Sequence, residues 1–355
     1  MLNNSLTHNE KLVLYGLIRY PPLNNRELSQ TLGLKQSTVT AIHRKLKQRG
    51  YIRTVRVPLL QSLGSEMLAV TYSVFSSSMS LDSRLQISAD IAEKHDEVFW
   101  AVSETTQGIS LQISKNFTEI KMNIERLEKA YCKHNVTSEP SITLLPFPFK
   151  LSKVINFFDF APFLNQIFDL KKGDNEQVPA YGGDNNGVFL NESEKPVYHA
   201  LIKYPSLSDK ELAEILSISR HTIARARKKF ENDALIKTIR IVDLKKLGFE
   251  ILVLNHFSFN MKLSEGEKKR GIEALMENKQ PIFMVLGDVE GVSLVPYKSF
   301  EEYRECCGKI ADLNKKIGMF SKAPTSLLLS TTSMTHIKDH DYAPLTKKIL
   351  GIYVD

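Results

Sequence analysis

Residues 206–240 read SLSDKELAEILSISRHTIARARKKFENDALIKTIR, a stretch that predicts two short helices, a tight turn and a strand. Ser208 and Glu211 have the spacing of a capping box, in which each side chain bonds a backbone amide at the start of a helix. Ser217 to Ser219 interrupts the first helix, and the Ser219 hydroxyl can cap the second.

The second helix of this stretch has an apolar face and a basic face. Ile223, Ala226 and Phe230 form the stripe that we expect to be buried, whereas the basic residues point outward. Residues 236–241 then alternate apolar and polar side chains, as a half-buried strand does. The pattern predicts a winged helix-turn-helix, the unit that presents one helix to a DNA major groove.

The same pattern occurs earlier in the chain. With a shift of 184 residues, the capping box at 24–27 falls on 208–211, and the strand at 52–57 falls on 236–241. With the same shift 63–64 falls on 247–248, and after small slips 108–111 matches 291–294 and 159–162 matches 341–344. This period is too long for a solenoid repeat. We interpret it as a duplicated module, copy one (residues 1–188) and copy two (residues 189–355).

Each copy is expected to hold a winged helix-turn-helix and then a ferredoxin-like βαββαβ domain. In copy one the helices are predicted at 8–20, 25–32 and 36–48, and the strand at 51–57. The second part follows with strands and helices predicted at 66–75, 81–94, 98–103, 109–114, 117–134 and 141–146. Its counterparts in copy two are predicted at 249–259, 265–277, 282–286, 292–297, 300–316 and 325–331. The fold class is α+β, with the two modules in a pseudo-two-fold arrangement.

The predicted boundaries place helix-turn-helix units at 1–60 and 189–244, and ferredoxin-like sensor domains at 61–150 and 245–333. Between the copies, 151–188 should contain an extra helix at 154–170, packed on the first module, and a polar, glycine-rich flexible linker at 171–187. Residues 334–355 should form a C-terminal helix or tail.

Composition is that of an ordinary globular protein, with 42% hydrophobic and 25% charged residues in 355. A net charge of +7 permits a polyanionic partner without requiring one. Three cysteines are too few for a disulfide framework, and no run of residues reads as a membrane span or signal peptide. We therefore expect a cytoplasmic, prokaryotic protein.

The sequence offers little evidence for catalytic or cofactor-binding motifs. The sequence contains no phosphate loop, nucleophile elbow or paired-carboxylate motif, so we expect no enzyme, cofactor or metal. Cys306 and Cys307 are interpreted as one buried and one half-exposed thiol on an amphipathic helix. His336 and His340 have metal-ligand spacing but no evident third ligand, and Trp100 is assigned to core packing.

The layout resembles the leucine-responsive and asparagine-regulator (Lrp/AsnC) family of prokaryotic transcription regulators. The resemblance is strongest from Glu211 to Phe259, where residues 236–248 are similar to that family's hinge between domains. It implies a DNA-binding regulator whose sensor sheets pair with each other and respond to a small molecule. Family members usually carry one module per chain, whereas this chain carries two.

An effector site is implied by the same resemblance, at the turn where the family tends to have Gly-x-x-Asp. Copy two has Gly287, Asp288 and Glu290 there, and these are the candidate effector-binding residues. Copy one reads ETTQ at 104–107, so the resemblance does not extend the effector site to that half.

Basic residues gather at the candidate DNA-contacting surface. No acidic residue occurs between Glu27 and Glu66, a window that holds seven basic ones, which is what neutralising phosphates requires. Candidates for base edges are Gln36, Ser37 and Thr40 in copy one, with Arg220, His221 and Ala224 in copy two. Candidates for phosphates are Arg44, Lys47, Arg53, Arg56, Arg225, Lys228, Lys237 and Arg240. For any single residue, a solvated helix face is an equally good explanation.

The sequence therefore predicts a regulator that binds double-stranded DNA as a fused pseudo-dimer, with a small-molecule effector and further homodimerisation through the sensor sheets as additional possibilities. Two alternatives remain open. The siroheme decarboxylases resemble the same layout and act as enzymes on a tetrapyrrole, using His or Arg near the sensor sheets. A partner-binding regulator with one degenerate DNA-binding half is the other.

Overall fold

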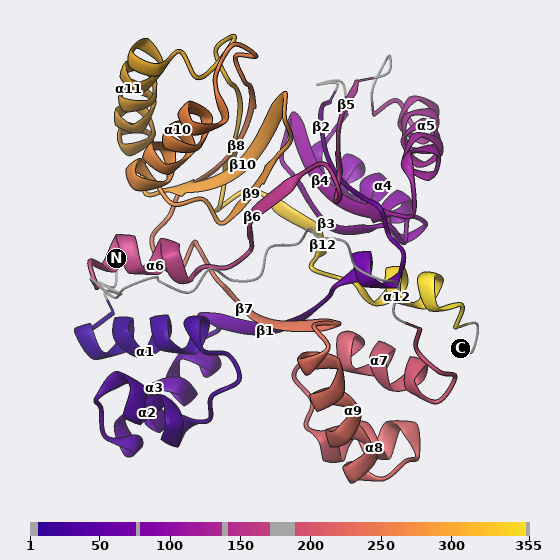
Figure 1. Cartoon of the computed structure of the whole chain (residues 1–355). Helices are drawn as coiled ribbons and strands as arrows, with labels where there is room; N and C mark the ends of the chain where they lie inside the picture. The colour runs from indigo at the N-terminus through magenta and orange to yellow at the C-terminus, as the bar shows by residue number, and fades with distance from the viewer. Residues whose placement is uncertain (1–5, 76–78, 137–140, 171–188, 353–355) are drawn as a thin grey trace. The chain divides into compact units, whose positions relative to one another are not determined.

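The computed structural model describes residues 6–75, 79–136, 141–170 and 189–352 (Figure 1). The chain divides into two compact units. The first unit draws on Met1–Thr54, Lys153–Ala180 and Thr238–Thr332, and the second on Val55–Ser152, Tyr181–Lys237 and Ser333–Asp355. Each unit thus combines the helix-turn-helix of one copy with the ferredoxin-like domain of the other.

The helix-turn-helix of the first unit begins the chain. It consists of α1 (His8–Arg19), α2 (Asn25–Leu32) and α3 (Gln36–Gln48), followed by β1 (Ile52–Pro58). Asn24 and Glu27 form the predicted capping box, and Thr7 and Glu10 form another. Gly33 ends α2 with φ of 68°, a left-handed conformation that glycine adopts without steric cost.

The second unit contains the corresponding helices from copy two. These are α7 (Glu194–Lys203), α8 (Asp209–Leu216) and α9 (Arg220–Asn232), followed by β7 (Ile236–Val242). The Ser208–Glu211 capping box is present, and the Ser219 hydroxyl accepts a hydrogen bond from the Thr222 amide. Ile223 and Phe230 are buried as predicted, and Ala226 is half-buried. The predicted helix-turn-helix units are therefore confirmed as local structure.

Strands β1 and β7 form a two-stranded sheet, and the boundary between the compact units passes through both strands. In the first unit the Asp243 amide donates to the Tyr51 carbonyl at 3.0 Å, and in the second the Leu59 amide donates to the Leu235 carbonyl at 2.9 Å. The wing strand of each copy is therefore paired with the wing strand of the other.

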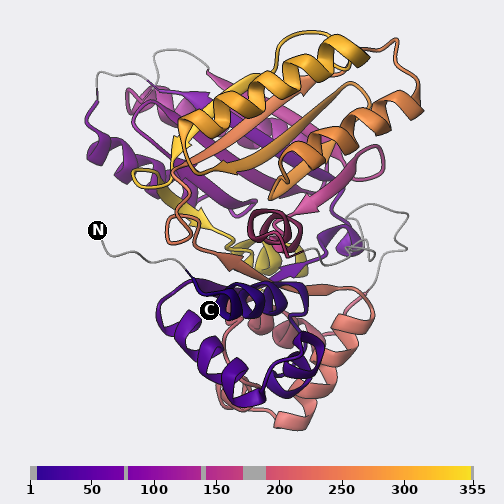
Figure 2. The same ribbon diagram turned by 90° about the vertical axis from the view of Figure 1, so that its left-hand side faces the viewer.

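The ferredoxin-like domain of the first unit has the predicted βαββαβ order. Its elements are β8 (Ile251–Ser258), α10 (Glu265–Asn278), β9 (Phe283–Leu286), β10 (Glu290–Tyr297), α11 (Phe300–Ile317) and β11 (Thr325–Ser330). The strands lie antiparallel in the order β11-β8-β10-β9-β6. Helices α10 and α11 cover one face of this sheet (Figure 2).

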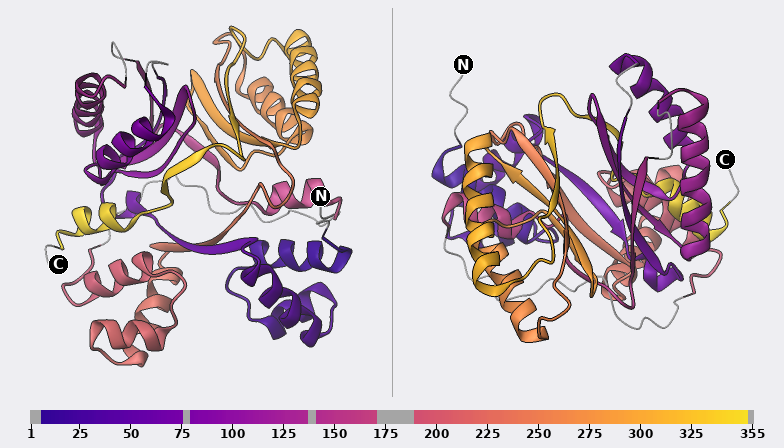
Figure 3. Two further views of the ribbon diagram at one scale, coloured as in Figure 1. Left: turned by 180° about the vertical axis from the view of Figure 1, so that it is seen from behind. Right: turned by 90° about the horizontal axis from the view of Figure 1, so that it is seen from above.

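The second unit holds the other domain of this type. Its elements are a 3₁₀ turn (Leu60–Leu63), β2 (Met67–Val74), α4 (Leu81–Glu93), β3 (Val98–Ser103), β4 (Gln107–Ser114), α5 (Phe117–Lys133) and β5 (Ile142–Pro148). The strand order is β12-β3-β4-β2-β5, and α4 and α5 cover one face (Figure 3). Met67 of β2 belongs there to one apolar cluster with Ile91 of α4 and Ile124 of α5.

The fifth strand of each sheet comes from the other copy. Strand β6 (Lys153–Phe157) follows β5 in sequence yet pairs with β9, and β12 (Thr335–Asp339) follows β11 yet pairs with β3. The predicted helix over 154–170 is therefore wrong for its first part, because the helix begins only at Ala161, and its expected packing on the first module is met by the Lys11 ammonium of α1 over the Phe168 ring. Val154 and Phe157 of β6 are buried and Ile155 is exposed, and a shift of register between Val154 and Asn156 interrupts the strict alternation of a strand.

Short helices follow both exchanged strands. Helix α6 (Ala161–Phe168) packs on the first unit's sensor domain, where the Gln166 amide nitrogen donates to the Glu277 carbonyl at 2.9 Å. The Phe163 ring lies 4.9 Å from that of Phe249. Helix α12 (Ala343–Leu350) holds the corresponding place in copy two. The predicted linker at 171–187 lies outside the described residues.

Asn156 ties the exchanged strand β6 into the first unit. Its side-chain amide nitrogen donates to the carbonyls of Asp159 and Pro281, both at 2.9 Å, and its oxygen accepts from the Asp159 amide at 2.8 Å. Replacing Asn156 with Ala should lower the free energy of unfolding by about 2 kcal/mol, since the side chain makes three partly buried hydrogen bonds that alanine cannot make. Thermal unfolding followed by circular dichroism measures this. Lys153→Ala, at an exposed position on the same strand, is the control, and equal melting of the two variants would contradict the assignment.

Candidate nucleic-acid interface and sensor pockets

Helix α3 has one buried side and one exposed side. Val39 and Leu46 are buried against the rest of the helix-turn-helix. The predicted contact residues on the other side are all exposed, namely Gln36, Ser37, Thr40, Arg44 and Lys47. The first half of this face offers amide and hydroxyl groups, and the second half offers cations.

Helix α9 presents the same division in the second unit. Ile223 and Phe230 are buried, while the predicted residues Arg220, His221, Arg225 and Lys228 are exposed. No acidic side chain lies in the first turn of α9. The start of the helix therefore carries arginine and histidine where α3 carries glutamine and serine.

Arg56 and Arg240 are not available to phosphates, which corrects the prediction for both. Arg56 is 6% exposed, and its guanidinium donates to the Leu201 carbonyl at 2.9 Å. Arg240 donates to the Leu17 carbonyl and, at 3.1 Å, to the Pro21 carbonyl. Each side chain donates to carbonyls near the end of the first helix of the other copy, α7 for Arg56 and α1 for Arg240. Burial lowers the pKa of both guanidiniums.

Arg53 and Lys237, also predicted to contact phosphates, are half-buried on β1 and β7. They hold the same position in the two copies, since 53 + 184 = 237. The strands therefore contribute two partly exposed cations, and the recognition helices contribute the fully exposed ones.

Ion pairs and hydrogen bonds tie α3 and α9 to the two helices that precede each of them in the sequence. Lys229 on α9 pairs with Glu194 at 2.6 Å, and Lys45 on α3 pairs with Glu10 at the same position in copy one. The Lys229 ammonium lowers the pKa of Glu194. Burial alone would raise the pKa of Glu10, but hydrogen bonds from Lys45 and Thr7 bring it below its usual value.

A second contact of this kind differs in chemistry between the copies. Arg227 pairs with Asp209 at 2.8 Å in the second unit. In the first unit a His43 ring nitrogen lies 2.8 Å from the Asn25 side-chain oxygen. These pairs were not predicted from the sequence, although all eight residues obey the 184-residue shift.

The predicted effector residues lie on the turn between β9 and β10, and that turn is already bonded to a side chain. The Lys268 ammonium donates to the carbonyls of Gly287 and Asp288, at 3.0 and 2.9 Å, and lies over the Phe259 ring. Glu290 pairs with His256 at 3.1 Å. In the second unit Arg84 takes the place of Lys268, because its guanidinium lies over the Phe75 ring and donates to the Glu104 carbonyl and, at 2.7 Å, to the Ser103 hydroxyl. None of the three effector candidates lines a pocket described below.

The first unit contains a cavity that was not predicted from the sequence. Its volume is about 460 Å³, within the range of small-molecule sites, and we name it the α11 cavity. It lies between the sheet and helices α10 and α11, with Phe257, Met284 and Ile310 among its lining residues. The signal in the sequence was only the amphipathic pattern of the two helices, which does not reveal how well they fill the space beneath them.

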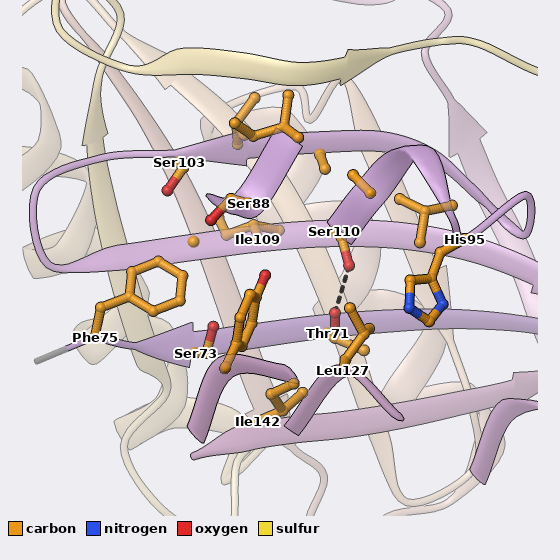
Figure 4. A pocket seen from close by; sticks show the side chains of 17 residues that line it. Thr71, Ser73, Phe75, Ser88, His95, Ser103, Ile109, Ser110, Leu127 and Ile142 are labelled. Carbon is orange, nitrogen blue, oxygen red and sulfur yellow. Dashed lines mark hydrogen bonds between the residues drawn. The ribbon is translucent and has the colours of Figure 1, made fainter. Parts of the chain in front are cut away.

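Two pockets lie in the second unit. One, of about 60 Å³, holds the place that corresponds to the α11 cavity (Figure 4). Phe75 and Leu127 line it, and Thr71 is hydrogen-bonded to Ser110 at 2.6 Å across two of its strands. The other, of about 470 Å³, is lined mostly by polar and charged side chains. They come from α5, α12 and the residues just after α4 and α5, and include Arg126, His95 and His134.

The remaining sequence candidates have structural roles. Cys306 is buried on α11, which confirms that part of the interpretation, and Cys307 is exposed rather than half-exposed. His336 and His340 lie on and just after β12, with their rings at the edge of Trp100, and both contact Asp339. Within the described parts of the chain, no cluster of His, Cys, Asp and Glu could hold a metal ion, and no helix is long and apolar enough to span a membrane.

Comparisons with known proteins give one match to the first helix-turn-helix unit and another to nearly the whole chain. Residues 6–58 match the model of the MarR family, which covers the first helix-turn-helix unit. No curated protein matches the sequence. The crystal structure of the siroheme decarboxylase NirDL is similar over 97% of this chain and 99% of its own, with 12% identity and a TM-score of 0.52, so the two share a fold. AsnC from E. coli matches 40% of this chain and 93% of its own, with 17% identity and a TM-score of 0.32. The regulator NMB0573 of Neisseria meningitidis, in complex with L-Met, matches 40% and 90%, with 18% identity and a TM-score of 0.34.

His43 should make the first unit sensitive to acid. Burial, followed by the charges of Arg240 and Lys47, lowers the pKa of His43 below its usual value of 6.5. The folded state therefore binds this proton less readily than the unfolded state. Its contribution to stability is complete above pH 6.5 and is lost as the pH falls from there toward the folded pKa.

The measurement compares thermal unfolding of the wild type and of His43→Gln at pH 7.5 and pH 5. We expect the wild type to lose more stability than the variant between these values. Burial also lowers the pKa of His95 and His199, and the comparison with the variant removes their shared contribution. Equal losses in the two proteins would contradict the role of His43.

Proposed function

We propose that this chain is a sequence-specific DNA-binding transcription regulator in which two helix-turn-helix units act as a fused pair. The observation that carries the proposal is the exposed face of α3, where Gln36, Ser37 and Thr40 precede Arg44 and Lys47 on one side of a helix whose other side is buried. The match of residues 6–58 to the MarR family supports the winged-helix assignment.

The chemistry of the face suits a major groove. Glutamine can bond adenine through two groups, and arginine can bond guanine in the same way, so Gln36 and Arg220 are the proposed readers of sequence. Arg44, Lys47, Arg225 and Lys228 are the proposed phosphate contacts, which set the register of the helix on the duplex. Lys45 and Lys229 are already paired with carboxylates, so we assign them to fixing the helices.

Fusion of the two units has two physical consequences. Once one helix is bound, binding of the other becomes intramolecular, which raises affinity without any new contact. The two readers are also free to differ, and Gln36-Ser37 against Arg220-His221 favours unlike half-sites. A small-molecule effector acting through a sensor domain remains part of this proposal, with the turn at Gly287 a weaker candidate because Lys268 already bonds it.

The test is binding of the full chain to mixed genomic DNA fragments across a salt titration. We expect selective recovery of a few fragments, with log K falling linearly with log salt concentration. Arg44→Ala combined with Lys47→Ala should reduce that slope by about 2, one for each phosphate that is no longer neutralised. A double replacement of exposed cations in the first unit's sensor domain, Lys269→Ala with Lys322→Ala, removes the same charge and should leave the slope unchanged. Absence of DNA binding at low salt would contradict the proposal.

A second candidate is an enzyme that acts on a tetrapyrrole, as the siroheme decarboxylases do. Two observations favour it: the fold shared with NirDL over nearly the whole chain, and the larger pocket of the second unit, which His95, Arg126 and His134 line together with Asp96 and Glu97. Imidazole and guanidinium groups suit the carboxylate side chains of such a substrate. The α11 cavity contains neither His nor Arg among its lining residues.

Titration of the full chain with siroheme separates the two candidates. If the second candidate holds, the Soret band should shift with saturation at one equivalent, and Arg126→Ala should weaken binding about tenfold through loss of a charge-assisted hydrogen bond. Lys129→Ala, at an exposed position on the same helix, is the control. An unchanged spectrum would remove the enzyme from consideration and leave the DNA-binding proposal in place.

A further inference from the structure

We propose that the α11 cavity is a binding site for one small amphipathic molecule that has an apolar body and a hydrogen-bond-donating group at one end. The proposal is independent of DNA binding, because every residue that lines the cavity belongs to the sensor domain of the first unit. It also differs from the effector site implied by the sequence, whose residues lie on the turn bonded by Lys268.

The walls of the cavity are mostly apolar and adaptable. The sheet contributes Phe257, Met284 and Val295, while α10 and α11 contribute Met276 and Ile310. Methionine is unbranched and flexible, and it adjusts its shape to different ligands. At about 460 Å³ the cavity far exceeds the space of about 10–15 Å³ that one water needs. Such a volume suits a body of two or more rings, or a branched aliphatic chain.

One polar atom at the cavity lacks a partner. The side-chain oxygen of Asn278 is buried and accepts no hydrogen bond from the described residues, while its nitrogen donates to the Cys306 carbonyl at 3.4 Å. Leaving a buried acceptor unpaired is unfavourable, and a donor on a ligand would relieve this. An amide N–H, a hydroxyl or an amine is therefore the expected polar group.

The buried cation of the cavity does not call for an anion. Lys279 pairs with Glu302 at 2.5 Å, and its ammonium lies 5.6–5.8 Å from the rings of Phe163, Phe249 and Tyr297. Its charge is thus already balanced by a carboxylate and aromatic faces. Recognition should rest on apolar contact and on the donor to Asn278 rather than on a ligand carboxylate.

The equivalent space in the second unit is filled by the protein itself. Helices α5 and α11 begin at Phe117 and Phe300, so Tyr131 and Asn314 hold the same position (131 − 117 = 314 − 300). The Tyr131 ring lies 5.8 Å from that of Phe75, at the small pocket shown in Figure 4. Asn314 instead accepts from the Phe320 amide at 2.7 Å. The chain should therefore bind one molecule, in the first unit only.

The cavity has an accessible side. Cys307, Ala311 and Lys315 line it from α11, are spaced at four-residue intervals on one face of the helix, and are exposed. Ligand entry past this face requires no movement of the sheet. The same face gives experimental access, because a side chain enlarged at Ala311 would project into the mouth of the cavity without disturbing the core.

The experiment uses the full chain and the fluorescent probe N-phenyl-1-naphthylamine, which is uncharged and combines aromatic rings with an N–H donor. We expect saturable fluorescence enhancement at one probe per chain. Ala311→Phe should weaken binding about tenfold or more by occupying the mouth. Glu128→Phe places the same ring at the corresponding position of α5 and should change binding by less than about twofold. Two equal sites per chain, or equal binding by both variants, would overturn the proposal.

A measurement without substitutions protects the test against a folding defect. Iodoacetamide alkylation of Cys307, followed by peptide mass spectrometry, should slow when the probe is saturating, since the thiol lies at the cavity. Cys132, in the second unit, should react at an unchanged rate and serves as the internal control. Burial raises the pKa of Cys306, so that neighbouring thiol should react slowly throughout. Probe binding that left the Cys307 rate unchanged would place the probe elsewhere and overturn the assignment.

Discussion

The need to pair the edge strand of each ferredoxin-like sheet, β9 in the first unit and β3 in the second, is the constraint on which the rest of the structure depends. An edge strand presents unpaired backbone groups, and a stable protein must pair or cover them. Here β9 is covered by β6 and β3 by β12, and both covering strands come from the other copy. Neither copy can complete its own sheet in this arrangement, so the two compact units each require both halves of the chain.

The same reciprocity reaches the helix-turn-helix units. Arg56 and Arg240 extend from the wing strands to carbonyls at the first helix of the other copy, where helix ends leave acceptors unsatisfied. These arginines anchor the wing strands β1 and β7 to α7 and to the end of α1. Ion pairs to Glu10 and Glu194 then tie α3 and α9 to the first helices of their own copies.

The two sensor domains share a fold and differ in what fills the space beneath their helices. Tyr131 occupies the second unit's space, whereas Asn314 turns to a backbone amide and leaves the α11 cavity open. The exposed starts of α3 and α9 differ as well, with glutamine and serine in α3 and arginine and histidine in α9. A chain with two modules can keep one as scaffold and give the other a ligand, which two identical subunits cannot do.

The sequence by itself determined the elements and their order, because capping boxes and hydrophobic periodicity act within a few residues. Ser208–Glu211, Asn24–Glu27 and the apolar stripe of α9 could all be predicted for this reason, as could the exposed face of α3. Only the tertiary structure decided the roles of Arg56 and Arg240, the partner of β6, and the α11 cavity. Each of these depends on which distant segment lies beside a residue, and the charge or spacing of that residue carries no information about its neighbour.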